Sequence, residues 1–125
     1  MSNIAEWQVI LVDDEPDSLN LIAEMLALRG AEVYRAAGGA EALALLKGVA
    51  LTVIVVDLSM PRPDGWDVLA AIRATPQLAG VPVVAITAFY SDRVEDEAHR
   101  AGFDGFCPKP IKSDEFLRLL QNLIG

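Results

Sequence analysis

Cysteine is nearly absent from this chain, because Cys107 is the only one among 125 residues. A single cysteine excludes an intramolecular disulfide and any metal site built from several cysteines. Long apolar runs are also missing, since none approaches the ~20 residues needed to cross a bilayer. The first residues, MSNIAEW, do not pair a basic segment with an apolar one. This start predicts no secretory signal, and the cytoplasm is the expected compartment.

Positively charged residues are also scarce. The chain has 10 Lys and Arg against 18 Asp and Glu, which gives a net charge of −8. This excess of acid argues against direct binding to nucleic acid or to anionic membrane surfaces. It is compatible with a cation held by clustered carboxylates. Internal repeats, low-complexity segments and linkers are absent, and the length and the 53% apolar content suit one folded domain.

Five short apolar runs alternate with stretches of helical periodicity along the chain. The runs predict strands, and the stretches after them predict helices because apolar residues recur there every three or four positions. Gly30 and Gly102 suit helix ends, while Ser91 and Ser113 suit the caps of the fourth and last helices. We expect strands at 9–12, 31–36, 52–57, 81–87 and 104–107, and helices from Pro16 to Gly30, at 40–47, from 64–65 to about Pro76, at 91–101 and from Ser113 onward.

This alternation predicts an α/β fold in which one parallel five-stranded sheet carries helices on both faces. Crossovers between parallel strands are right-handed, which leaves few possible strand orders. The runs at 9–12, 52–57 and 81–87 are continuously apolar and suit central positions, whereas 31–36 and 104–107 are more polar or shorter and suit the edges. The order 2-1-3-4-5 meets these conditions, so we expect a flavodoxin-like (βα)5 three-layer sandwich.

Polar side chains stand where four of the predicted strands end. Because the carboxyl ends of parallel strands meet at one edge of the sheet, we expect these side chains to converge. Two carboxylates ~5 Å apart repel by about 3 kcal/mol at an effective dielectric of ~20, so a cluster of three requires cations. Lysine supplies one positive charge, and a site lined by oxygen ligands suits Mg²⁺. The residues are Asp13 and Asp14 after the first strand, Asp57 after the third, Thr87 after the fourth and Lys109 after the fifth.

Such a site has the groups needed to take up a phosphoryl group. A carboxylate beside a divalent ion, a lysine and a hydroxyl could attack phosphorus while the cations neutralise the phosphoryl oxygens. Over about residues 8–124, the chain resembles the receiver domain of bacterial response regulators. The motifs that carry the resemblance follow one another at successive strand ends: Asp13-Asp14, Asp57 with Met60-Pro61 and Asp64-Gly65, Thr87-Ala88, and Lys109-Pro110.

The resemblance implies a role in two-component, or phosphorelay, signal transduction. Asp57 would accept a phosphoryl group from the phosphohistidine of a histidine kinase or phosphotransfer protein. Asp14 and Asp57 would ligate Mg²⁺ together with the backbone carbonyl of Ser59, and Asp13 would act on the metal through water. The protein would therefore be a phosphoacceptor and not an enzyme, although it would catalyse its own phosphorylation and dephosphorylation.

The resemblance also assigns the remaining polar residues and an output surface. Thr87 and Lys109 would bind phosphoryl oxygens, Phe106 would be the switch aromatic, and the Lys109–Pro110 peptide bond would be cis. The chain would be a single receiver domain over 1–125 without an output domain. The fourth helix, fifth strand and fifth helix would face a downstream protein or a second copy in a homodimer. Residues to consider on this surface are Arg93, Glu97, Phe106 and Lys112.

Two other functions stay open. One is a protein-interaction module of the same fold that works without phosphorylation, against which the intact polar set argues. The other is a hydrolytic phosphatase with Asp57 as nucleophile, which would need an acid where Ser59 stands. Among the single residues, Asp14 could instead cap the first helix, and Asp64 suits a helix start better than a ligand position.

Three side chains bear on the lifetime and readout of a phosphoryl group on Asp57. Ser59 is too short to hold an attacking water, and Phe89, two residues after Thr87, could shield the site. We therefore expect a comparatively long-lived aspartyl phosphate. Phe106 lacks the hydroxyl of the tyrosine that is commoner in the family, so a switch of this ring would depend on packing alone.

Overall fold

The computed structural model describes residues 3–48 and 50–125 and contains one parallel sheet of five strands. The strand order is β2-β1-β3-β4-β5, and all neighbouring pairs are parallel, which confirms the flavodoxin-like sandwich predicted from the sequence. The strands are β1 (Gln8–Val12), β2 (Glu32–Ala36), β3 (Val53–Asp57), β4 (Val83–Thr87) and β5 (Gly105–Pro108). The helices are α1 (Pro16–Ala27), α2 (Gly39–Leu45), α3 (Gly65–Arg73), α4 (Asp92–Ala101) and α5 (Ser113–Ile124), with 3-10 turns η1 (Ile4–Glu6) and η2 (Pro76–Leu78).

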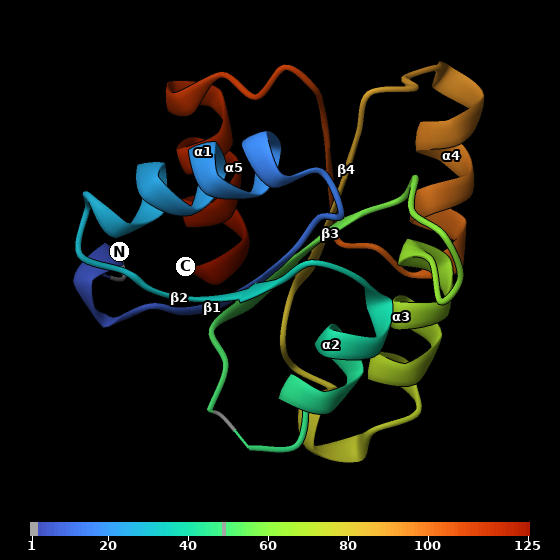
Figure 1. Cartoon of the computed structure of the whole chain (residues 1–125), viewed down its shortest axis with the longest axis horizontal. Coiled ribbons are helices and arrows are strands. Elements are labelled where there is room, and N and C mark those ends of the chain that lie inside the picture. Colours follow the sequence, from blue (N-terminus) through green and yellow to red (C-terminus); the bar gives the residue numbers. More distant parts are fainter. Residues whose placement is uncertain (1–2, 49) are drawn as a thin grey trace.

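Two apolar clusters fill the space on the two sides of the sheet. Helices α1 and α5 cover one face, and α2, α3 and α4 cover the other (Figure 1). In β3, Val53 and Val55 pack with α1 and α5, whereas Ile54 and Val56 pack with the helices on the opposite face. Successive side chains of a strand point to opposite faces, so a strand that serves both clusters must be apolar throughout. This requirement explains the unbroken valine and isoleucine run that precedes Asp57.

The edge strands differ from the central ones as the sequence predicted. All five residues of β3 and of β4 are buried, whereas β2 is mostly exposed or half-buried and β5 is only partly buried. All five predicted strand starts are wrong by one or two residues, and the error is largest for β4, which begins at Val83 and not at residue 81. Residue 82 is a proline that has no N–H to give to a ladder, although its carbonyl accepts a hydrogen bond from Ile54.

The helix ends confirm some predicted caps and correct others. Asp64 caps α3 in a reciprocal capping box with Asp67, and the Ser91 hydroxyl accepts the Val94 N–H at 3.1 Å. Ser113 is not a cap, since it is the first helical residue of α5 and Lys112 precedes it without a side-chain bond. Helix α1 ends three residues before Gly30, and α3 ends at Arg73, after which Pro76 begins η2.

The η1 turn and the end of α5 lie at the amino edge of the sheet, opposite the strand ends that carry the polar residues. Figure 1 shows both near the start of β1. Helix α5 runs back along the sheet, so that Leu123 lies next to Gly105 at the start of β5. Among residues 3–48 and 50–125, no helix has both the length and the apolar character that a membrane span requires.

Candidate functional site

Strands β1, β3, β4 and β5 deliver their polar residues to one edge of the sheet. In the strand register, Asp57 pairs with Ile86 and Thr87 with Pro108, so adjacent strands end at nearly the same level. The buried polar residues in the described chain are Asp13, Asp57 and Thr87. Burial of such groups is costly unless partners satisfy them, and it therefore marks this edge as a built site.

Lys109 joins two of the buried carboxylates. Its Nζ lies 2.7 Å from Asp13 Oδ2 and 2.9 Å from Asp57 Oδ2, and its side chain is only 13% exposed. The Lys109 backbone N–H also donates to the Thr87 carbonyl at 2.8 Å, which fixes the lysine to the end of β4. The predicted convergence of these residues at the sheet edge is therefore correct.

The remaining hydrogen bonds to Asp13 and Asp57 come from the segments that follow their strands, including the first turn of α1. Asp13 Oδ1 accepts the Glu15 N–H at 3.0 Å, and its Oδ2 accepts the Ser18 hydroxyl at 2.6 Å. Asp57 Oδ1 accepts the Ser59 N–H at 2.8 Å. Each buried carboxylate thus has both a loop donor and Lys109, and the contribution of Ser18 was not predicted from the sequence.

The two carboxylates differ in proton affinity. Burial would raise the pKa of Asp13, but hydrogen bonds from Lys109, Ser18 and the Glu15 N–H outweigh it, and the pKa lies below its ordinary value. Burial also raises the pKa of Asp57, and Lys109 and the Ser59 N–H offset it only in part, so the pKa lies above its ordinary value. The surroundings therefore stabilise the charged carboxylate of Asp13 more than that of Asp57.

Asp14 completes a cluster of three carboxylates. It is exposed, and carboxylate oxygens of Asp13, Asp14 and Asp57 all lie within 4.8 Å of one another. Asp14 does not cap α1, since Glu15 occupies that position without a side-chain cap bond, and within the described chain Asp14 has no hydrogen bond or ion pair. Three carboxylates with one lysine between them leave excess negative charge, and all-oxygen donors of this kind fit a hard divalent cation such as Mg²⁺.

Ser59 and Thr87 lie side by side above Asp57. Their hydroxyl oxygens are 3.4 Å apart, and the Thr87 hydroxyl oxygen accepts the Phe89 N–H at 3.0 Å. The Phe89 side chain itself is 72% exposed. The Thr87 hydroxyl therefore lies at the site, as predicted, whereas the ring of Phe89 is mostly exposed to solvent and its shielding role remains a prediction.

Phe106 contacts an aromatic residue that the sequence gave no reason to single out. Its half-buried ring lies 5.8 Å from the ring of Tyr90, at an interplanar angle of 57°. The Tyr90 hydroxyl lies 2.9 Å from an Asp92 carboxylate oxygen and 3.3 Å from a Glu95 oxygen, on the first turn of α4. The hydroxyl missing from Phe106 is thus present on its neighbour, where it ties the ring pair to α4.

These acceptors strongly favour the protonated form of Tyr90. The hydrogen bond and negative charge of Asp92, with smaller contributions from burial and Glu95, raise the pKa of Tyr90 to about 12. Burial and Glu32 also raise the pKa of Tyr34, the second of two tyrosines. In Tyr34→Phe, where Tyr90 is the remaining tyrosine, we expect a single tyrosinate transition near pH 12 in the absorbance spectrum. Asp92→Asn should move that transition down, and a wild-type midpoint at 10 would contradict the contact.

The loop between β3 and α3 passes very close to the backbone of its neighbours. A Cβ on Gly65 would overlap the Asp57 carbonyl oxygen and lie 2.8 Å from the Leu58 Cα. Gly65 is thus required by the close approach of α3 to the strand that carries Asp57.

The Lys109–Pro110 peptide is cis, as predicted, and so is Arg62–Pro63, which was not predicted.

The chain is similar to known proteins in both its sequence and its structure. The profile of the family described as "Response regulator receiver domain" matches residues 9–121. A 14.6 kDa uncharacterized protein of Leptolyngbya boryana is 34% identical over 97% of this chain and 92% of its own length. Among solved structures, the Vibrio cholerae chemotaxis protein CheY4 superposes with a TM-score of 0.88 at 30% identity, covering 94% of this chain and 98% of its own. The receiver domain of the Pseudomonas aeruginosa sensor histidine kinase PA1611, with a magnesium ion in its active-site cleft, gives 0.87 at 30% identity and covers 95% and 98%.

Proposed function

Because the chain belongs to the family of response regulator receiver domains, signalling domains of two-component systems, we propose that it accepts a phosphoryl group on Asp57. The donor would be the phosphohistidine of a histidine kinase or phosphotransfer protein. The observation that carries the proposal is the bridge from Lys109 Nζ to Asp13 and Asp57, at 2.7 and 2.9 Å, beside the exposed carboxylate of Asp14. A module that only bound other proteins would not need this buried set of charges.

The proposed reaction gives a role to each polar residue at the carboxyl edge of the sheet. A carboxylate oxygen of Asp57 attacks phosphorus, the new O–P bond forms, and the P–N bond to the donor imidazole breaks so that neutral histidine leaves after protonation. Lys109 and the Thr87 hydroxyl would then contact oxygens of the transferred group. Asp13, Asp14 and Asp57, with the Ser59 carbonyl, would hold Mg²⁺, which supplies neutralisation of phosphoryl charge when bound.

Labelling by a small-molecule phosphodonor tests this proposal. With acetyl phosphate and Mg²⁺, we expect one phosphoryl group per chain by intact-mass spectrometry, and none after Asp57→Asn or in the presence of a chelator. Asp17→Asn, which removes an exposed acid on α1, should label like the wild type. Unchanged labelling of Asp57→Asn would reject Asp57 as acceptor. Absence of any labelling would favour the interaction module, and rapid multiple turnover would favour the phosphatase.

The lifetime of the phosphoryl group is expected to depend on Phe89. Its backbone N–H is tied to the Thr87 hydroxyl, so the ring is held two residues from a group that would contact phosphate. We expect Phe89→Ala to increase the rate of dephosphorylation severalfold, because a methyl group excludes less water than a phenyl ring. Decay of the labelled protein over time measures this rate. An unchanged rate would show that the ring does not shield the site.

The readout of phosphorylation would use the surface formed by α4, β5 and α5. Exposed residues on α4 include Arg93 and Glu97, which form an ion pair at 3.0 Å, and Lys112 lies just before α5. The Tyr90–Phe106 contact connects this surface to the segment that follows Thr87. We propose that a downstream protein, or a second copy of the chain, binds here when the equilibrium between two conformations shifts.

A further inference from the structure

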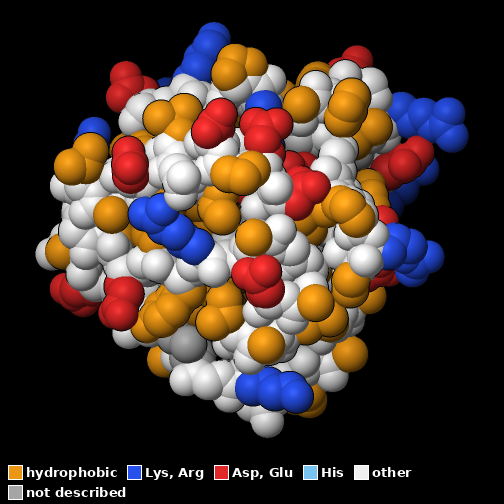
Figure 2. Space-filling model, in the orientation of Figure 1, with side chains coloured by type: hydrophobic (Ala, Val, Ile, Leu, Met, Phe, Trp, Pro, Cys, Tyr) orange, Lys and Arg blue, Asp and Glu red, His pale blue; other side chains and the backbone are white. Residues whose placement is uncertain are grey.

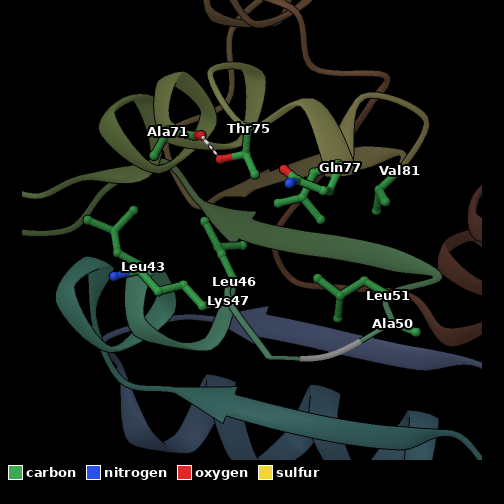
Figure 3. A pocket seen from close by; sticks show the side chains of 10 residues that line it. Leu43, Leu46, Lys47, Ala50, Leu51, Ala71, Thr75, Gln77 and Val81 are labelled. Carbon is green, nitrogen blue, oxygen red and sulfur yellow. Dashed lines mark hydrogen bonds between the residues drawn. The ribbon is translucent and has the colours of Figure 1, made fainter.

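A second hollow lies far from the carboxylate cluster, between α2 and the segment that follows α3. This α2–α3 groove has a volume of about 790 Å³, within the range of ~300–1,000 Å³ that is usual for small-molecule sites. Figure 3 shows Leu43 of α2 and Leu46 just after this helix on one side, and Ala71, Thr75 and Gln77 on the other. None of its lining residues belongs to the carboxylate cluster, so the groove is a separate feature of the protein.

The lining of the groove is mainly aliphatic. Leu43, Leu46, Leu51 and Val81 are half-buried, and Leu78 is 5% exposed. The four large apolar side chains that are exposed in the described chain lie elsewhere, on or just after α1 and between β4 and α4. The groove therefore offers a separate, half-buried apolar surface.

The residues that line the groove include one cation and no acid. None of the 18 acidic residues falls in segments 42–56 or 68–91, which supply all its lining residues. Each of these segments contains one cation, Lys47 or Arg73. Arg73 pairs with Asp104 at 2.9 Å, whereas Lys47 is exposed and has no ion pair within the described residues. Figure 2 shows one blue group and no red in the lowest part of the face, where Figure 1 places the end of α2, and the exposed acid Glu41 lies near the start of that helix.

We propose that the α2–α3 groove binds an amphiphilic carboxylate such as a medium-chain fatty acid, with its alkyl chain against the leucines and its carboxylate beside Lys47. The net charge of −8 disfavours anions over most of this protein, but the lining of the groove contains no acid and one lysine that has no ion pair within the described residues. Burial of an alkyl chain contributes about 0.8 kcal/mol per CH₂ group, which makes the leucine lining the main source of affinity. The Thr75 hydroxyl already donates to the Ala71 carbonyl at 2.8 Å, so Lys47 is the group that selects the charged end.

Titration with decanoate below its micelle concentration tests this site. Calorimetry should give saturable one-to-one binding, and ¹⁵N–¹H NMR spectra should show shifts centred on Leu46, Leu51 and Thr75. Lys47→Glu should weaken binding by about fivefold, the upper range for one exposed ion pair. Ala50→Asp, which places an acid on an exposed lining position, should weaken it as well. Arg29→Glu, an equal charge change at an exposed position after α1, should leave the affinity unchanged.

Several results would overturn the proposal. Absence of saturable binding would do so, as would shifts centred on the exposed Leu28 or Phe89 instead of the groove. Equal affinity for decanoate and decanol, or for the wild type and Lys47→Glu, would reject the carboxylate. Binding of a helical peptide at the groove, together with no binding of decanoate, would assign the groove to a partner protein instead. Labelling of Asp57 is measured separately, so the failure of one proposal is distinguishable from the failure of the other.

Discussion

Replacement of Lys109 by alanine is expected to lower the free energy of unfolding by about 3 kcal/mol at pH 7, because it leaves two buried carboxylates without their shared cation. Asp13 and Asp57 are both buried, and Lys109 Nζ lies within 3 Å of an oxygen of each. Loop donors remain on both acids, but none of them carries a positive charge. The loss should therefore exceed that of any exposed lysine.

Urea denaturation in the presence of a chelator measures this loss. Lys47→Ala is the matched control, since Lys47 is exposed and has no ion pair in the described part of the chain, and it should change stability by less than about 0.5 kcal/mol. In the Asp57→Asn background, Lys109→Ala should cost clearly less, because only one buried charge is then left unpaired. Equal losses in the two backgrounds would contradict the shared role of Lys109.

The same lysine predicts how stability changes at high pH. Burial would lower the pKa of Lys109, but hydrogen bonds and charges from Asp13 and Asp57 outweigh it and raise the pKa above its ordinary value of 10.5. The folded protein therefore binds this proton more tightly than the unfolded chain does. Its contribution to stability is fully present below pH 10.5 and is lost as the pH rises through the folded-state pKa, where the wild type and Lys109→Ala should converge.

Gly65→Ala is the second change with a large expected effect. The new Cβ would overlap the Asp57 carbonyl oxygen and come within 2.8 Å of the Leu58 Cα, and neither backbone atom can move without shifting the end of β3. We expect a loss of about 3 kcal/mol in the free energy of unfolding, at the upper end for overpacking. Because Asp57 would move relative to Lys109, labelling by a phosphodonor should also fall severalfold.

Gly80→Ala is the control for this substitution. A Cβ at Gly80 meets nothing within 4 Å, so the change should alter stability by less than about 1 kcal/mol and leave labelling unchanged. Thermal or urea unfolding of both variants gives the comparison. If Gly65→Ala were as stable as Gly80→Ala, the close approach of α3 to β3 would be wrong.

The strand order and the strand-end residues could be predicted because both follow from local pattern. A buried parallel strand requires a continuous apolar run, and the residue after it must lie at the carboxyl edge. Asp13, Asp57, Thr87 and Lys109 therefore converge as predicted. Their roles as acceptor, metal ligands and phosphoryl contacts remain predictions that the labelling experiment tests.

Other features depend on the paths of loops and on contacts between distant segments, which a linear pattern does not define. The need for glycine at position 65 arises only once α3 has packed against β3. The Tyr90–Phe106 contact joins two segments that are neighbours only through the pairing of β4 and β5. Helix caps were predicted correctly at Ser91, where the serine precedes the first turn, and wrongly at Ser113, where it lies one residue inside the helix.

The positions of η1 and of the end of α5 at the amino edge bear on how the protein can be handled. A linker fused to either end, or a chip surface attached through it, would leave the carboxylate cluster facing away from the attachment point. A soluble phosphodonor or kinase would then reach Asp57 equally well whether the linker is fused to the N-terminus or to the C-terminus.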